Sequence, residues 1–124
     1  MTYTVVIADD DADIRALVAI AVNKAGLQIM ANVEDGAAAL AAIHEFSPDL
    51  AILDVSMPEM TGLQVVSAIR ADPSVGDVRV LLLTASVDEH TRAVGAQVGA
   101  DHFIAKPFSP RELTAFLAVG KEPR

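Results

Sequence analysis

Residues 49–54 read Asp-Leu-Ala-Ile-Leu-Asp, and they are the clearest sign of the fold class in the sequence. The run from Leu50 to Leu53 is apolar on both alternating faces, which is typical of a strand buried on both sides in a parallel sheet. Such a sheet is covered by helices on both of its faces. Asp54 closes the run, and an aspartate at the end of a buried strand adds little to sheet stability. The stretch therefore predicts a central parallel strand that ends in a functional aspartate.

Four further β-rich apolar runs lie along the chain, and segments with helical periodicity separate them. The predicted strands are residues 4–8, 28–33, 50–54, 78–84 and 102–105. The predicted helices run from about Ile14 to a stop at Gly26, from Asp35-Gly36, from Thr61-Gly62 to before Asp72-Pro73, from Asp88 to Gly99 with Gly95 weakening it, and from Ser109-Pro110 onward. This alternation predicts a single α/β domain with a doubly wound five-stranded parallel sheet and helices on both faces.

The composition narrows the class of protein. The chain has 124 residues, no cysteine and a net charge of −8, from 9 basic against 17 acidic residues. It is long enough for one well-formed core, and it has no disulfide, thiolate metal site or cysteine nucleophile. The negative charge opposes direct nucleic-acid binding. No apolar run is long enough to span a bilayer and no signal peptide precedes the first strand, so we expect a cytoplasmic protein without membrane contact.

Polar side chains close four of the predicted strands. Asp9-Asp10 follow the first strand, Asp54 ends the third, Thr84 ends the fourth and Lys106 follows the fifth. The carboxyl ends of parallel strands form the ligand-binding edge of such a sheet, so these groups should converge. Carboxylates this close repel one another unless a cation lies among them, and oxygen ligands favour Mg²⁺. The lysine and the hydroxyl are then available to hold a phosphoryl group.

Each of these residues also has an ordinary structural interpretation. The acidic group from Asp9 to Asp11, together with Asp13, can simply cap the first helix. Thr84 taken alone is a common β-branched strand residue, and Lys106 alone is a common surface cation. The four strand-end positions in this order favour a site.

These motifs resemble those of a known family, the receiver domains of bacterial two-component response regulators, including the stand-alone chemotaxis type. The resemblance covers nearly the whole chain and rests on residues 5–11, 49–54, Met57-Pro58 to Gly62, Leu83-Thr84-Ala85, and Gly99-Ala100-Asp101 with Lys106-Pro107-Phe108. It implies a flavodoxin-like fold with strand order 2-1-3-4-5. We expect a receiver domain over residues 1–119 and a tail or linker start over residues 120–124. Met1 directly before the first strand suggests that the receiver opens its polypeptide.

The resemblance assigns roles to the site residues. It implies that Asp54 is the phosphoacceptor and that Asp9 and Asp10 bind Mg²⁺ together with Asp54 and the backbone carbonyl of Ser56. Lys106 would pair with the phosphoryl oxygens, and its bond to Pro107 is expected to be cis. Thr84 and Phe103 would be the two switch residues, one with a hydroxyl and one with an aromatic ring.

The resemblance also implies a function. A sensor histidine kinase or phosphotransfer protein would phosphorylate the chain, and the change would pass to a downstream effector through the fourth helix, fifth strand and fifth helix. The resemblance implies a signalling domain with weak self-phosphorylation and autodephosphorylation, and not a metabolic enzyme. We expect a monomer or a phosphorylation-dependent dimer. His102 stands where many DNA-binding relatives carry an acidic residue for dimer salt bridges. Ser56 and Ser86 occupy positions that tune the lifetime of the phosphoryl group.

Two alternatives stay open at this point. An aspartyl-phosphate phosphatase of the haloacid dehalogenase type also uses a strand-end aspartate and Mg²⁺, but it needs a second aspartate two residues later, where this chain has Ser56. A degenerate receiver that acts as a phosphorylation-independent interaction module usually lacks the acidic pair, the acceptor or the lysine. All three are present here.

Overall fold

The computed structural model describes residues 3–85 and 89–120, and in the last two of these only the backbone. A five-stranded sheet with strand order β2-β1-β3-β4-β5 forms its centre, and all neighbouring strands are parallel. The strands are β1 (Thr4–Ala8), β2 (Gln28–Val33), β3 (Leu50–Asp54), β4 (Arg79–Thr84) and β5 (His102–Ala105). Both the expected fold class and the expected strand order are therefore confirmed. The fourth strand begins one residue later than predicted, at Arg79, while Val78 is buried just before it.

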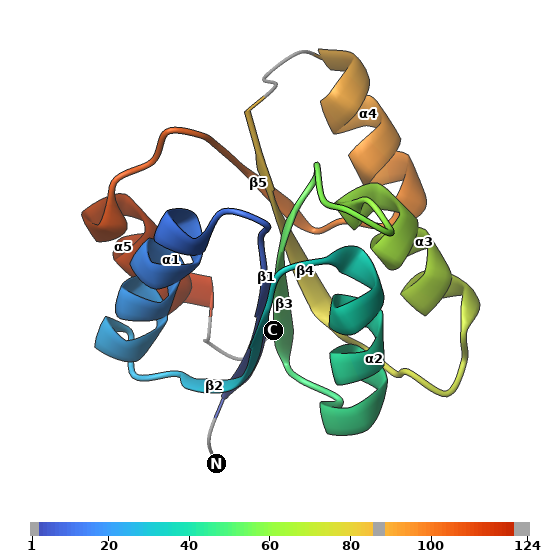
Figure 1. Ribbon diagram of the computed structural model, residues 1–124, viewed down its shortest axis with the longest axis horizontal. Coiled ribbons are helices and arrows are strands. Elements are labelled where there is room, and N and C mark those ends of the chain that lie inside the picture. The colour runs from blue at the N-terminus through green and yellow to red at the C-terminus, as the bar shows by residue number, and fades with distance from the viewer. Residues whose placement is uncertain (1–2, 86–88, 121–124) are drawn as a thin grey trace.

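Helices cover both faces of the sheet, as Figure 1 shows. They are α1 (Ala12–Lys24), α2 (Gly36–Phe46), α3 (Gly62–Ala71), α4 (Glu89–Val98) and α5 (Pro110–Gly120). In the figure α1 and α5 lie on one side of the strands, and α2, α3 and α4 lie on the other. The predicted start of the fourth helix at Asp88 lies outside the described residues.

The core has two layers because alternate strand residues point to opposite faces. One layer packs beneath α2, α3 and α4 and includes Ala51, Leu53, Val80 and Leu82. The other packs beneath α1 and α5 and includes Leu50, Ile52, Leu81 and Leu83. All residues of β3 are buried, as the apolar run predicted for a central strand.

Local sequence signals set the helix ends. The Asp11 side chain caps α1 by accepting a hydrogen bond from the Asp13 amide. Asp35 caps α2, and Thr61 forms a capping box with Gln64 at the start of α3. The Ser109 hydroxyl accepts a hydrogen bond of 3.0 Å from the Glu112 amide at the start of α5. These caps set where α1, α2, α3 and α5 begin, and so set the length of the loops that join them to the strands before them at the carboxyl edge of the sheet.

Candidate functional site

Side chains from four strands meet at the carboxyl edge of the sheet. Within the described part of the chain, the buried polar or charged residues are Asp9, Asp54 and Thr84, with exposed fractions of 0%, 5% and 3%. All three stand at this edge, and Lys106 joins them from the end of β5. Burial of polar groups is unfavourable unless they are paired, so their concentration here indicates a functional site.

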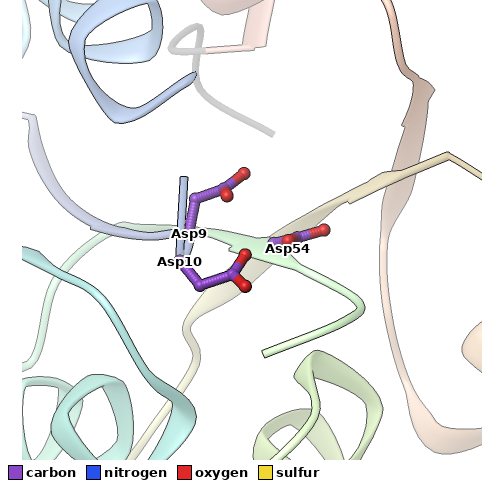
Figure 2. A group of neighbouring side chains, drawn as sticks. All are labelled: Asp9, Asp10 and Asp54. Atoms are coloured by element: carbon purple, nitrogen blue, oxygen red, sulfur yellow. The ribbon is translucent and has the colours of Figure 1, made fainter. Parts of the chain in front are cut away.

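Three carboxylates form a compact cluster. One oxygen each of Asp9, Asp10 and Asp54 lies within 4.8 Å of the other two. Figure 2 shows Asp9 and Asp10 at the end of β1 and Asp54 at the end of β3, with Asp10 and Asp54 directed to the same side. Asp10 is exposed while the other two are buried. The cluster is therefore open to solvent on one side.

Within the acidic run, Asp13 lies in the first turn of α1, where its charge favours the helix dipole, and the residue that caps the helix is Asp11. Its side chain accepts hydrogen bonds from the amides of Asp13 and Ile14, at 2.9 and 3.4 Å. Asp9 instead has its two carboxylate oxygens bound to different groups. The Asp11 amide donates to Oδ1 at 2.9 Å, and the Lys106 ammonium donates to Oδ2 at 2.8 Å.

Sequence reasoning did not find one contact of Asp9. The guanidinium of Arg15, in the first turns of α1, donates a hydrogen bond of 2.8 Å from Nη1 to the backbone carbonyl of Asp9. The Asp9 amide in turn donates to the Val33 carbonyl at 3.2 Å. Arg15 lies six positions after Asp9 on a helix, and no sequence motif considered above pointed to it. The backbone of Asp9 is thus hydrogen-bonded to α1 through its carbonyl and to β2 through its amide.

Lys106 connects two of the carboxylates. Its Nζ lies 2.8 Å from Asp9 Oδ2 and 3.3 Å from Asp54 Oδ1. Desolvation, the largest single influence, lowers its pKa, but the hydrogen bond to Asp9 and the charge of Asp54 outweigh it, so the pKa is raised above the ordinary value. The Lys106–Pro107 bond is cis, as expected from the sequence. The lysine is therefore a permanent positive charge in the site.

Asp54 ionises less readily than an ordinary aspartate. Desolvation by burial, followed by the charge of Asp9, raises its pKa to about 6, although Lys106 and the backbone of Ser56 act in the opposite direction. A cation placed among the three carboxylates would offset both of the raising influences. A bound cation would therefore keep a larger fraction of Asp54 ionised, and the ionised carboxylate is the form that can act as a nucleophile.

The donor set fits a hard divalent cation. Asp9, Asp10 and Asp54 offer only carboxylate oxygens and Asp10 is exposed, so the cluster suits Mg²⁺, which keeps several of its waters. Ser56, the fourth predicted ligand, is exposed two residues after Asp54, and its backbone hydrogen-bonds to Asp54. The three predicted carboxylate ligands thus lie in one place, and the Ser56 carbonyl stays a prediction as the fourth ligand.

Gly62 brings the loop after β3 close to Asp54. A Cβ at position 62 would lie 2.4 Å from the Asp54 carbonyl oxygen, so a side chain cannot fit there. The Gly62 amide also donates to the Val55 carbonyl at 2.9 Å. From the sequence Gly62 marked a helix start and the end of the motif that begins at Met57, but its contact with Asp54 is tertiary and was not predicted.

The two predicted switch residues, Thr84 and Phe103, lie on the same face of the sheet, but they are not paired with each other across β4 and β5. Thr84 pairs with Ala105, and Phe103 pairs with Leu82. Because Leu82 and Thr84 are two positions apart, their side chains share one face. Phe103 is half-buried against the layer beneath α2, α3 and α4. Thr84 at the site and Leu82 beside Phe103 therefore lie on the same face of β4.

Comparison with known proteins identifies the family. The model of the response regulator receiver domain matches residues 5–118. The chain belongs to this family, whose members act in bacterial two-component systems.

Among relatives, the phosphate regulon transcriptional regulatory protein PhoB of Pseudomonas aeruginosa is 39% identical over 114 residues, which is 92% of this chain and 49% of that protein. The DNA-binding response regulator MtrA of Mycobacterium tuberculosis is 37% identical over 115 residues, which is 93% of this chain and 49% of that protein. The chain thus spans about half the length of these relatives. The chemotaxis response regulator CheY4 of Vibrio cholerae is similar in structure, with a TM-score of 0.86, 32% identity, and coverage of 94% of this chain and 97% of that one.

Two further expectations concerned binding to nucleic acid and contact with a membrane. The expectation of no direct nucleic-acid binding is not supported, because relatives such as MtrA are named as DNA-binding regulators. The expectation rested on the charge of this chain alone, which says nothing about a domain elsewhere in a longer protein. Over residues 3–85 and 89–120, no helix has the length and apolar character needed to cross a membrane.

Proposed function

We propose that this chain is a phosphorylation-activated signalling switch that accepts a phosphoryl group on Asp54 in an Mg²⁺-dependent reaction. The observation that carries the proposal is the position of Asp54, buried at the end of β3, clustered with Asp9 and Asp10 and 3.3 Å from Lys106. The donor would be a phosphohistidine on a sensor kinase or phosphotransfer protein. The receiver domain would span residues 1–119, with residues 120–124 as a tail or linker start.

In the transfer step, an ionised oxygen of Asp54 attacks phosphorus. The new bond is between this oxygen and phosphorus, and the bond that breaks joins phosphorus to the histidine nitrogen, which keeps the electron pair. Mg²⁺, when bound by Asp9, Asp10, Asp54 and the Ser56 carbonyl, would supply charge neutralisation of the phosphoryl oxygens. Lys106 would pair with another of these oxygens, and its present contact with Asp9 would break when it does so.

Hydrolysis would reset the switch. Water attacks the phosphorus of the acyl phosphate and releases inorganic phosphate, and the carboxylate of Asp54 is regenerated. Thr84 would hydrogen-bond to the phosphoryl group while it is present, and Phe103 would respond to that movement. The surface formed by α4, β5 and α5 would then change its affinity for an effector protein or domain. We propose that the chain works in the cytoplasm, as a monomer or as a dimer that forms on phosphorylation.

The proposal is tested with acetyl phosphate, a small donor that needs no kinase. With Mg²⁺, intact-mass spectrometry should show the addition of one phosphoryl group to the wild-type chain. Asp54→Asn should show none, because an amide is not a nucleophile here. Asp13→Asn, which changes an exposed carboxylate outside the cluster, should be labelled like the wild type. An undiminished phosphoprotein peak in Asp54→Asn would place the acceptor elsewhere and refute the assignment.

A further inference from the structure

The ring of Phe103 lies directly against the backbone of α4 at Gly95. A Cβ built on Gly95 would lie 2.4 Å from Cζ and 2.5 Å from Cε1 of this ring, and 3.4 Å from Leu82 Cδ1. Atoms cannot approach so closely, so the ring occupies the space that any side chain at position 95 would need. The sequence interpretation of Gly95 as a residue that only weakens the helix misses this contact.

The backbone at Gly95 is held in place. Its carbonyl accepts hydrogen bonds from the amides of Ala100 at 2.9 Å and Gly99 at 3.2 Å, and the Gly99 amide is also 3.2 Å from the Ala96 carbonyl. Gly99 has φ +108, and this arrangement is the Schellman closure of a helix C-terminus. The helix therefore cannot easily move away from the ring at this turn.

A second anchor comes from α3. The Arg70 side chain donates from Nε to the Gly99 carbonyl at 3.0 Å and from Nη2 to Asp101 at 3.0 Å. The same Asp101 oxygen accepts from the Val80 amide of β4 at 2.8 Å. The last turn of α4 is thus tied to α3 and β4, and the ring is the part that must yield to a side chain at position 95.

We propose that Gly95 is the positioning residue for the Phe103 ring, because the space left without a side chain there accepts the ring. With the ring in this space, the α4–β5 surface keeps its unphosphorylated arrangement. The second half of this inference rests on the proposed function. A methyl group at position 95 displaces the ring and shifts the surface toward the phosphorylated arrangement, while the carboxylates and Lys106 stay untouched.

The position of the ring is tested by thermal unfolding in two backgrounds. Alanine has a higher helix propensity than glycine, so Gly95→Ala should raise the melting temperature wherever the ring is absent. We expect a rise in the Phe103→Ala background and a fall in the wild-type background. Ala93→Gly, at an exposed position of the same helix, should lower both by the same amount. An equal rise from Gly95→Ala in both backgrounds would overturn the inference.

The effect on the surface is tested by amide chemical shifts. In metal-free Gly95→Ala, the α4 and β5 amides should move part of the way along the line from unliganded wild type to wild type with Mg²⁺ and beryllofluoride, a phosphoryl mimic. The Asp9, Asp10 and Asp54 amides should not move. Shifts confined to the neighbours of Gly95, or off that line, would overturn the surface effect. If beryllofluoride leaves wild-type α4 and β5 unchanged, the proposed function and this surface effect both fail, and the melting experiment still decides the ring position by itself.

Discussion

Lys106 lies closer to Asp9 than to Asp54, with its Nζ 2.8 Å from Asp9 Oδ2 and 3.3 Å from Asp54 Oδ1. The lysine thus neutralises a carboxylate that is also a proposed ligand of Mg²⁺. A cation bound to the Asp9 carboxylate withdraws negative charge from it, so the carboxylate becomes a weaker acceptor for the ammonium group. Metal binding should therefore release the lysine toward Asp54 and the incoming phosphoryl group.

Removal of the ammonium group should strengthen metal binding. In Lys106→Met the three carboxylates lose their internal cation, and we expect the Mg²⁺ affinity to rise on the order of tenfold. Isothermal titration calorimetry measures this directly. Lys24→Met removes a positive charge from the far end of α1 and should leave the affinity nearly unchanged. Equal or weaker binding in Lys106→Met would show that the lysine does not compete with the metal.

The acidic cluster should make stability depend on Mg²⁺. A ligand that binds the folded state alone stabilises it by about 2.7 kcal/mol at a hundredfold excess over Kd, so the melting temperature should rise with millimolar Mg²⁺. Asp10→Ala should lose most of this response and, since repulsion is relieved, melt higher than metal-free wild type. Asp13→Ala serves as the control. No response to Mg²⁺ in the wild type would show that the acidic cluster is not a metal site.

The raised pKa of Asp54 should be visible in stability without metal. Its folded pKa of about 6 exceeds the ordinary 3.8, so its contribution to stability is complete below about pH 3.8 and is lost as the pH rises through 6. Asp54→Asn cannot ionise and avoids this loss. The free energy of unfolding of the variant relative to the wild type should increase by up to about 3 kcal/mol between pH 4 and 7. Urea unfolding at several pH values measures the difference, and a constant difference would contradict the burial argument.

The anchor at the end of α4 gives a further stability prediction. Asp101→Ala leaves the Val80 amide without its side-chain acceptor, and it should cost about 1–3 kcal/mol. Arg70→Met removes only a partly exposed ion pair and its hydrogen bonds, and it should cost about 1 kcal/mol or less. The free energies of unfolding from urea titrations compare the two variants. Both variants lose the ion pair, so a larger cost for Arg70→Met would make the Arg70 hydrogen bond to the Gly99 carbonyl, and not the Val80 bond, the main contribution.

Much of the fold could be predicted because local signals carry it. The apolar run of β3 marks a buried strand, Asp35 and Thr61 mark helix starts, and Gly26 marks a helix end. The convergence of Asp9, Asp54 and Lys106 also followed, because parallel strands bring their carboxyl ends to one edge.

Contacts between distant elements were not predictable in this way. The Arg15 hydrogen bond to the Asp9 carbonyl depends on the rotamer of a long side chain. The position of the Phe103 ring against Gly95 depends on how far α4 lies from β5, and residue types do not report that distance. Nor does the spacing of the chain show that Lys106 binds Asp9 more closely than Asp54.

The central claim is that the carboxylate cluster is a phosphoryl site coupled to the α4–β5–α5 surface. Its most direct test is amide chemical-shift mapping of the wild-type chain with and without beryllofluoride and Mg²⁺, with Asp54→Asn as the control. We predict large shifts in the loops after β1, β3 and β4 and also in α4, β5 and α5, and in the control none caused by beryllofluoride. Large shifts confined to the strand-end loops, with α4 and β5 unchanged, would contradict the account.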